Sequence, residues 1–414
     1  MYGAQLIEAL RRANANASVG TAAAGCLAER SSAGFPLTAS PELHSAGEPK
    51  VGGSPASKLE FFGVGGDRMR AAGCDTVIDA RDLAVVGITE ILSHLPKILG
   101  LYKNLIREAD RRKPDLAIVI DSPAFNWRVA RQMKRRGIPT IYYVAPQFWA
   151  WRQGRVRLLR DYIDKALVIF PFEERFYCDR GVDATFIGHP LAELPNPTIS
   201  RDEYAAQFNL NAAKPWITLM PGSRVKEVRM NLPTILESAA LLGADYECLL
   251  PVAPTLDRDF LSNLISERKI TLVPEALPAL FHSRAGIIAS GTATVEAAMM
   301  NTPFIMVYRV SLLTYLLGRP RVKVPRFAMV NLIAGEEVVP ELVQHNFTAG
   351  NVVSHLEAIL SDGPARKQML EGLARVKTLL RGNPSDAPTV HPADRAAKII
   401  LTFCTMDASI PVRQ

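Results

Sequence analysis

The stretch GIIASGTATVEAAMMNTP, residues 286–303, decides the fold class of this 414-residue chain. An apolar run through Ala289 leads into a turn of small residues, and a helix-forming segment follows from about Thr292 or Ala293. A strand without a polar face is buried on both sides, which is typical of parallel sheets covered by helices. The stretch therefore predicts a strand-turn-helix unit of an α/β domain.

The same alternation of apolar strand and amphipathic helix recurs along the chain. Strands are expected within residues 59–64, 115–121, 140–145, 165–170, 216–222, 246–253, 270–275, 285–290 and 303–309. The proline-rich stretch GHPLAELPNPTISRDEY, residues 188–204, is typical of an interdomain linker. We therefore predict two doubly wound α/β domains, with a ligand-binding cleft between the carboxyl ends of their strands.

The predicted domain bounds are 1–190 and 191–384. Residues 13–57 contain hardly any large apolar side chains, so we expect a solvated or disordered insert there. Residues 385–414 are expected to form a C-terminal helix and tail that could pack back on the N-terminal domain.

Composition limits the partners and the compartment. The five cysteines show no paired spacing, which argues against a zinc site or a disulfide framework and favours a reducing cytosol. No uncharged apolar run is long enough to span a membrane, and the first apolar stretch is interrupted by Glu8, Arg11 and Arg12, unlike a signal peptide. A net charge of +7 suits nucleic acid, an anionic membrane surface or phosphorylated substrates equally well.

Two turns in the second half are candidate phosphate sites. In the turn after residues 285–289, small residues let a ligand approach the backbone, and free amides at a helix start favour an anion. Its candidate residues are Ser290, Gly291, Thr292, Ala293 and Thr294. Glu296, about one turn into the helix, would reach sugar hydroxyls of a nucleotide. A tight structural turn with a solvent-facing glutamate explains the same residues equally well.

The second turn lies in LMPGSRVKEV, residues 219–228. Gly222 permits an unusual backbone angle, Ser223 follows it, and the Arg224 guanidinium is suited to a phosphate. A surface arginine in a loop is the competing interpretation. Two such turns in one domain favour a diphosphate site.

In the first half, Asp121 ends the apolar strand within LAIVIDSPAFN, residues 116–126. A carboxylate that emerges from such a strand into a cleft is partly desolvated and suits a general base acting on a hydroxyl. The alternative is an aspartate that caps the next helix.

Two further stretches have more than one interpretation. Aromatic and basic residues alternate over residues 142–160, including Trp151 and Arg152, which suits stacking on RNA bases, but a sugar or phosphate contact is the better interpretation. Apolar residues at spacings of three and four within 83–113 fit an amphipathic helix on a membrane, and they also fit a helix packed on a core.

Taken together, these motifs resemble the lipid-A-disaccharide synthase family, bacterial glycosyltransferases with the two-domain GT-B architecture. The matching segments are FGVGGDRMRAAGC, LAVVGITEIL, IDSPAFN, YYVAPQFWAWRQGRV, PFEERFY, FIGHPL, LMPGSRVKEV, ASGTATVEAAM and VNLIAGEEVVPELVQ. They run in order from Leu59 to Gln344, over most of the chain.

The resemblance implies transfer of a diacylated glucosamine from UDP to the 6-hydroxyl of a diacylated glucosamine 1-phosphate, with inversion and without metal or cofactor. It implies that Asp121 is the general base, that Arg224 lies near the diphosphate, and that Ser290 to Thr294, Glu296 and Asn331 bind UDP. Matching motifs add Asn126, Gln147, Trp151 and Arg152 as substrate contacts. The implied membrane-facing residues are Ile91, Leu92, Leu95, Ile98, Leu99 and Met230.

The implied partners are the two acylated sugars and the cytoplasmic face of the inner membrane, where the protein would be peripheral, and not nucleic acid. The family includes exchanged dimers, so a homodimer is a further expectation.

The chain departs from the family pattern at two places. Ala124 stands where the family often has a second aspartate, so Asp121 is the only acid of that turn. Family members also have a strand and a glycine-rich turn before the helix that matches YGAQLIEALRR, and we expect Met1 to be an internal methionine. The alternatives are a UDP-sugar-binding protein without catalysis, or another UDP-sugar transferase or epimerase.

Overall fold

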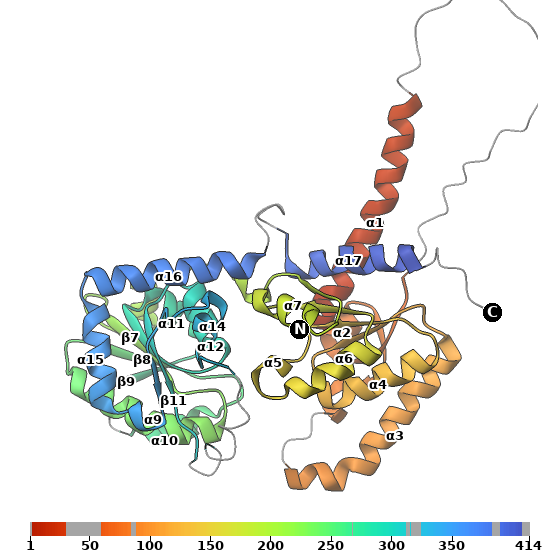
Figure 1. Ribbon diagram of the computed structural model, residues 1–414. Coiled ribbons are helices and arrows are strands. Elements are labelled where there is room, and N and C mark those ends of the chain that lie inside the picture. Colours follow the sequence, from red (N-terminus) through yellow and green to blue (C-terminus); the bar gives the residue numbers. More distant parts are fainter. Residues whose placement is uncertain are drawn as a thin grey trace, which may run out of the picture. The chain divides into compact units, whose positions relative to one another are not determined.

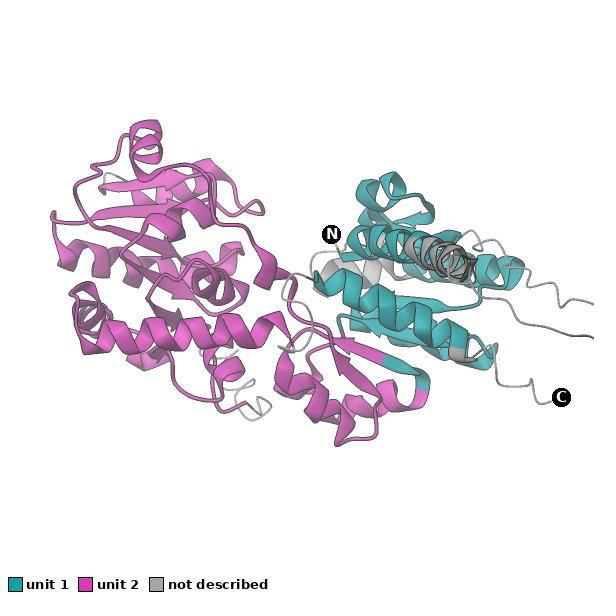
Figure 2. Cartoon of the chain, turned by 90° about the horizontal axis from the view of Figure 1, so that it is seen from above, with its two compact units in different colours: residues 1–144, 162–165, 390–414 teal, residues 145–161, 166–389 magenta. Residues whose placement is uncertain are grey.

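The computed structural model describes residues 2–29, 59–83, 88–266, 268–311, 315, 324–382 and 390–407. The chain divides into two compact units (Figure 2). Unit 1 comprises Met1–Val144, Tyr162–Lys165 and Val390–Gln414, and unit 2 comprises Ala145–Asp161 and Ala166–Thr389. Helices and strands alternate along the chain (Figure 1), and the strand pairings are parallel, which confirms the predicted α/β class.

Unit 1 contains two pairs of parallel strands. Strand β1 pairs with β2 in a two-stranded sheet, and β3 pairs with β4 in a separate sheet. The elements are α1 Tyr2–Glu29, β1 Phe61–Gly65, α2 Asp67–Ala71, β2 Cys74–Asp79, η1 Ala80–Leu83, α3 Ile88–Arg112, β3 Ala117–Ile120, α4 Pro123–Arg135, β4 Thr140–Tyr143 and α17 Pro392–Asp407. The second sheet has the order β3-β4-β5-β6, with β5 at Lys165–Val168 and β6 at Ala184–Phe186.

Helices α1 and α17 contact each other in unit 1, and they cross in Figure 1. Leu6, Ile7 and Leu10 of α1 are buried, and Arg12 Nη2 lies 2.7 Å from Asp394 Oδ1 of α17. Helix α1 continues to Glu29, so the irregular insert expected from residue 13 begins no earlier than residue 30. The physical reason is local composition, because residues 13–29 are rich in alanine and contain no proline. Residues 30–58 lie outside the described residues.

Unit 2 is built around a six-stranded sheet of order β12-β11-β10-β7-β8-β9. Its elements before this sheet are α5 Phe148–Trp151, η2 Gln153–Arg155, α6 Val156–Tyr162, α7 Pro171–Cys178, η3 Pro190–Glu193 and α8 Arg201–Phe208. The strands are β7 Trp216–Met220, β8 Glu247–Pro251, β9 Ile270–Val273, β10 Ala285–Ala289, β11 Phe304–Tyr308 and β12 Glu341–Val343. The remaining helices are α9 Val225–Leu242, α10 Arg258–Ile265, α11 Ala276–His282, α12 Thr292–Met299, α14 Met329–Ala334, η5 Gln344–Asn346, α15 Ala349–Leu360 and α16 Pro364–Arg381.

Helices cover both faces of this sheet, with α9 and α15 on one side and α11, α12, α14 and α16 on the other (Figure 1). Strand β10 is buried at every position, as its unbroken apolar run predicts. Strands β7 and β10 are parallel neighbours in this sheet, so the loops that follow them lie at the same edge. The two turns predicted to bind phosphate are therefore adjacent.

Candidate functional site

The turn between β7 and α9 is closed by a carboxylate of its own helix. Gly222 has φ +124°, and a Cβ added there would lie 2.7 Å from the Glu227 Cβ. One oxygen of Glu227 accepts hydrogen bonds from the amides of Ser223 (3.1 Å) and Arg224 (3.3 Å). The other lies 2.8 Å from Arg224 Nη1, and the Arg224 side chain is 80% exposed. Glu227 thus occupies the amides of Ser223 and Arg224, in the turn that the sequence predicts as a phosphate site.

The turn between β10 and α12 is held by its own hydroxyl groups. Gly291 has φ +137°, and its carbonyl accepts hydrogen bonds from the amide (3.1 Å) and the hydroxyl (2.7 Å) of Thr294. The Ser290 hydroxyl donates to the Phe327 carbonyl at 2.8 Å. Thr292 is exposed and Ala293 is half-buried. Ser290 and Thr294 therefore fix the turn, while Thr292 and Ala293 form its accessible start.

Glu296 lies on α12 one turn after this start, as expected. Its side chain is half-buried, and burial raises the pKa of its carboxyl. Within the part of the chain that the structure describes, this carboxyl makes no hydrogen bond or ion pair. A partly desolvated carboxylate with free acceptor oxygens is suited to sugar hydroxyls.

Asn331 is fully buried and its side chain is engaged inside unit 2. Its Nδ2 donates to the Val339 carbonyl (2.8 Å) and to Glu341 Oε1 (2.9 Å). Its Oδ1 accepts from the amides of Val338 and Val339 at 2.8 and 3.0 Å. The Glu341 carboxylate in turn accepts from the amides of Phe327 and Ala328, just before α14. Asn331 therefore holds the segments around it in place.

A polar network at this edge of the sheet has no counterpart among the predicted residues. Asn231 of α9 donates to the Pro221 carbonyl (2.9 Å) and accepts from the Arg309 amide (2.8 Å). The Arg309 guanidinium donates to the Thr234 hydroxyl at 2.7 Å. This network ties the β7–α9 turn to the end of β11. The available sequence signal is Arg309, a charged residue directly after a buried strand.

In unit 1, Asp121 and Ser122 follow β3 with left-handed backbones, φ +47° and +43°. The Asp121 carbonyl accepts hydrogen bonds from the Tyr142 hydroxyl (2.6 Å) and from Asn126 Nδ2 (2.5 Å), and Asn126 Nδ2 also donates to the Ile120 carbonyl (2.8 Å). Such a backbone costs about 1–3 kcal/mol per residue, so these contacts hold a strained turn.

The structure corrects one expectation about Asp121. Its side chain is exposed, so the partial desolvation expected for it is absent, because Asp121 lies beyond the last residue of β3 and its carboxylate does not lie among the core side chains. Ser122 is the N-cap residue of α4, and no side chain caps that helix. The capping alternative for Asp121 is therefore wrong as well. Asn126, a predicted substrate contact, is buried beneath the turn.

The aromatic and basic loop after β4 divides into a buried part and an exposed part. Phe148 and Trp149 are buried, and Trp149 Nε1 donates to Glu173 Oε1 at 2.7 Å. Gln147 and Trp151 are exposed. The Arg152 guanidinium stacks on the Trp151 ring, with 3.8 Å between its carbon and the ring centroid, and its pKa is lowered by burial and by Arg155.

Glu173 anchors this loop. It is fully buried, and its second oxygen accepts from the amides of Ile169 (3.2 Å) and Phe170 (3.0 Å). Burial raises its pKa to about 7, against the opposing effect of these hydrogen bonds. The ring of buried His189 lies 5.0 Å from that of Phe170, and burial lowers the pKa of His189 to about 4.

Three of the predicted membrane-facing side chains, Ile91, Leu92 and Leu95, lie outside the described side chains. On α3, Ile98 is half-buried and Leu99 is 47% exposed, and on α9 Met230 is half-buried. Among the described helices, none has the length and apolarity that a membrane span requires. Nor do the described residues gather three His, Cys, Asp or Glu side chains into a possible metal site.

Comparisons with known proteins identify the family. A family model for lipid-A-disaccharide synthetase matches residues 42–387. The lipid-A-disaccharide synthase of Koribacter versatilis (strain Ellin345) is 51% identical over 348 residues, covering 83% of this chain and 90% of that protein. The protein of the same name from Myxococcus xanthus (strain DK1622) is 41% identical over 329 residues, covering 77% and 85%.

Solved structures show the same fold at low identity. The calicheamicin glycosyltransferase CalG4 has a TM-score of 0.53 at 14% identity, over 84% of this chain and 91% of that chain. The UDP co-structure of MnaA from S. aureus has a TM-score of 0.51 at 12% identity, over 86% and 99%. These likenesses agree with the two-domain glycosyltransferase architecture, and the family match covers most of both units. The chain belongs to the lipid-A-disaccharide synthetase family.

Proposed function

We propose that the chain joins two acylated sugars. It transfers 2,3-diacylglucosamine from UDP to the 6-hydroxyl of 2,3-diacylglucosamine 1-phosphate and yields a β-1,6-linked disaccharide 1-phosphate and UDP. The observation that supports this most strongly is the family match over residues 42–387, because it includes both Asp121 and the two turns of unit 2. The residues of both regions have the chemistry that the reaction requires.

In this proposal unit 2 holds the donor. The exposed Arg224 guanidinium and the accessible start of α12, at Thr292 and Ala293, are suited to the diphosphate. Glu296 accepts hydrogen bonds from sugar hydroxyls. Ser290, Thr294 and Asn331 act indirectly, by fixing the backbone around these contacts.

Asp121 acts as the general base. Its carboxylate takes the proton of the acceptor 6-hydroxyl as that oxygen attacks C1 of the donor sugar from the face opposite UDP. The bond between C1 and the diphosphate oxygen breaks, UDP leaves with the bonding electrons, and the configuration at C1 inverts. The strained turn held by Tyr142 and Asn126 fixes the position of Asp121, and a fixed position favours reaction.

The N-terminal domain, residues 1–190, is proposed to receive the acceptor and to meet the cytoplasmic face of the inner membrane. Both substrates carry acyl chains, so the protein must bind them at a lipid surface. Exposed Leu99 and half-buried Ile98 are the described candidates for that surface in this domain, and half-buried Met230 of α9 is a candidate in the second domain. Gln147, Trp151 and Arg152 are proposed sugar or phosphate contacts, and a homodimer is proposed as the assembly.

The test is UDP release by the purified chain on vesicles that contain both acylated sugars. Asp121→Ala should lower kcat by about 10²–10⁴-fold, the usual contribution of a general base. Asp115→Ala is the matched control, because Asp115 is an exposed aspartate at the other end of the same apolar segment. UDP binding without turnover by the unmodified chain would support the non-catalytic alternative, and full activity of Asp121→Ala would exclude Asp121 as the base.

A further inference from the structure

Unit 2 contains a basic pocket at the edge of its sheet opposite the turns after β7 and β10. The pocket has a volume of about 490 Å³, and its titratable lining residues are Arg201, Lys214, His282, Arg284 and Arg366. Arg284 directly precedes β10, and its amide donates to the carbonyl of Trp216, the first residue of β7, at 2.8 Å. The pocket therefore lies at the amino ends of these strands, whereas the two candidate turns follow their carboxyl ends.

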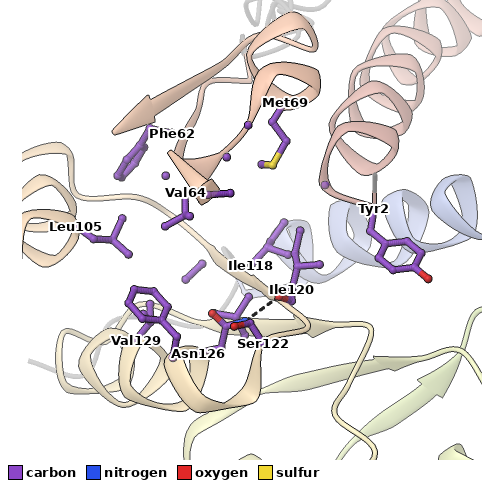
Figure 3. Close-up of a pocket in the computed structure, with 18 of the residues that line it drawn as sticks. Tyr2, Phe62, Val64, Met69, Leu105, Ile118, Ile120, Ser122, Asn126 and Val129 are labelled. Atoms are coloured by element: carbon purple, nitrogen blue, oxygen red, sulfur yellow. Dashed lines mark hydrogen bonds between the residues drawn. The ribbon is translucent and has the colours of Figure 1, made fainter. Parts of the chain in front are cut away.

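The lining of this basic pocket differs from that of the larger pocket in unit 1. The unit 1 pocket, of about 860 Å³, is bordered mainly by apolar side chains such as Phe62, Val64 and Ile118 (Figure 3). Among the described residues that line the basic pocket there are four cationic side chains and no carboxylate. Its chemistry is suited to an anion.

Two of these cations are close together and partly removed from water. Arg366 Nη1 donates to the carbonyls of Arg284 and Ile359, both at 2.8 Å. The Arg366 side chain is 12% exposed and the Arg284 side chain is 28% exposed. Burial lowers the pKa of Arg366, and the charge of Arg284 lowers it further, against the opposing effect of Asp362. Desolvated like charges destabilise each other, and a bound anion would offset this effect.

Two neighbouring carboxylates balance part of the positive charge. Asp362 Oδ1 lies 2.5 Å from Arg284 Nη2 and 3.8 Å from Arg366 Nε, and its side chain is 87% exposed. The exposed Asp202 acts on Arg201 through its charge, although it forms no ion pair with it. Four cations with two neighbouring carboxylates leave an excess of two positive charges among the described residues around the pocket.

Three of the cations also keep hydrogen-bond donors for a ligand. Within the described part of the chain, Nη1 of Arg284 and Nη2 of Arg366 have no hydrogen-bond partner. Lys214 Nζ uses one of its three donors on the Ala244 carbonyl, at 2.6 Å. Arg201, by contrast, donates to three backbone carbonyls and so holds the wall of the pocket.

We propose that this basic pocket binds a phosphate group, at a site separate from the turns that hold the donor. A terminal phosphate carries a charge of about −1.5 to −2 at neutral pH and has three acceptor oxygens. It therefore matches both the excess of two positive charges and the donors of Lys214, Arg284 and Arg366. A carboxylate brings a single charge and two oxygens, so it complements the pocket less well. The phosphate belongs either to a soluble compound or to a lipid headgroup.

Isothermal titration of the full chain with inorganic phosphate tests the proposal. Lys214→Ala should weaken binding by about tenfold or more, because a charged hydrogen-bond donor is lost. Asp362→Asn should tighten binding by about twofold to fivefold, because an exposed carboxylate that competes for Arg284 is removed. Lys367→Ala is the matched control, since Lys367 is exposed on α16 next to Arg366 and does not line the pocket.

Opposite effects of Lys214→Ala and Asp362→Asn cannot arise from a general loss of folding. Unchanged binding by Lys214→Ala would overturn the proposal. Arg224→Ala is titrated as well, and loss of all phosphate binding in that variant would assign the anion to the β7–α9 turn and also overturn the proposal. The readout does not use enzymatic activity, so it is independent of the proposed reaction.

Cosedimentation with vesicles that contain phosphatidic acid, which has a terminal phosphate, identifies the source of the phosphate. Vesicle binding that Lys214→Ala lowers and Lys367→Ala does not would assign the pocket to a lipid headgroup. Phosphate binding that depends on Lys214, together with vesicle binding that does not, would assign it to a soluble phosphate compound.

Discussion

Glu227 and Arg224 form an ion pair across the first turn of α9, with 2.8 Å between Oε1 and Nη1, while the other oxygen of Glu227 accepts from the loop amides. The pair orients an exposed guanidinium over the turn after β7. An anion that binds there meets Arg224 and competes with Glu227 for the amides. This relationship makes the β7–α9 turn sensitive to substitution at either residue.

Arg224→Ala is expected to weaken UDP binding by about 10-fold to 100-fold, because a hydrogen bond to a charged group contributes about 1.5–3 kcal/mol. The Arg224 side chain is 80% exposed, so the free energy of unfolding should change little. Isothermal titration with UDP measures the effect. Arg229→Ala is the control, since Arg229 is an exposed arginine of the same helix, near the Phe260 ring. Equal losses in both variants would contradict a specific role for Arg224.

Gly222→Ala and Gly350→Ala should have opposite effects on stability. At Gly222 the backbone is in a region that favours glycine and a Cβ would collide with Glu227, so we expect a loss of about 1–3 kcal/mol in the free energy of unfolding. At Gly350, in helix α15, a Cβ meets nothing within 4 Å, and alanine should add about 0.5–1 kcal/mol. Urea unfolding tests both values, and a stable Gly222→Ala would disprove the strain.

Glu173 and His189 are each buried and should give opposing pH dependences of stability. The pKa of Glu173 is about 7, above its ordinary value, so the folded state binds its proton more tightly and stability falls as pH rises from about 4.5 to 7. The pKa of His189 is about 4, below its ordinary value, so its contribution is complete above about 6.5 and is lost as pH falls toward 4.

Single substitutions should separate these two pH dependences of stability. In His189→Asn, where the asparagine can still accept from the Leu191 amide, the unfolding free energy should fall between pH 5 and 7 by at most about 3 kcal/mol, after the effects of other groups are subtracted. In Glu173→Gln the free energy of unfolding should rise over about pH 4–6.5. It should be lower overall than in the unmodified protein, because the loop loses its anchor. Denaturant unfolding at several pH values provides the measurement. Identical profiles in both variants would refute this account.

Asn126 and Tyr142 should be energetically coupled, because both donate to the Asp121 carbonyl. Asn126→Ala and Tyr142→Phe should each lower stability by about 1–3 kcal/mol and lower kcat by displacing the Asp121 carboxylate. The double variant should differ from the sum by about 0.5–3 kcal/mol. Urea unfolding of the unmodified protein, the two single variants and the double variant gives the coupling energy. Strict additivity would show that the two donors act separately.

Leu99→Asp should reduce association with anionic vesicles by about tenfold or more, because burial of a leucine side chain contributes about 1.5–3 kcal/mol. Leu241→Asp is the control, since Leu241 is also exposed and lies near the carboxyl end of α9. Cosedimentation with vesicles measures both. A similar loss in the two variants would place the contact elsewhere.

Long apolar runs made much of the fold predictable. Strands β7 and β10 were expected because their residues have no polar face, and both are buried from end to end apart from half-buried Met220. Strand β2 was not expected, because its sequence, CDTVID, contains two aspartates and lacks the unbroken apolar run of the predicted strands. Strands β6 and β12 are only three residues long, too short for a periodic signal.

The sequence predicted where the candidate site lies better than it predicted which side chains contact one another there. The turns at Gly222 and Gly291 follow from strand ends and small residues, whereas the partners of Asn331 and Glu227 arise from tertiary contacts and capping. A glutamate three residues after the N-cap is a capping-box signature, so Glu227 had a local signal in the sequence. The exposure of Asp121 had no local signal in the sequence, because it depends on where β3 ends in space.

The pairing of α1 with α17 has a consequence for biosynthesis. Residues 2–12 leave the ribosome long before the α17 residues that are buried in unit 1, such as Ala396 and Ile400. Unit 2 is complete by residue 389, so it can fold during translation. Ala4 and Ile7 of α1 can pack against Ala72 and Cys74 as soon as β2 is made, but the side of α1 that contacts α17 stays uncovered until residues 392–407 are made.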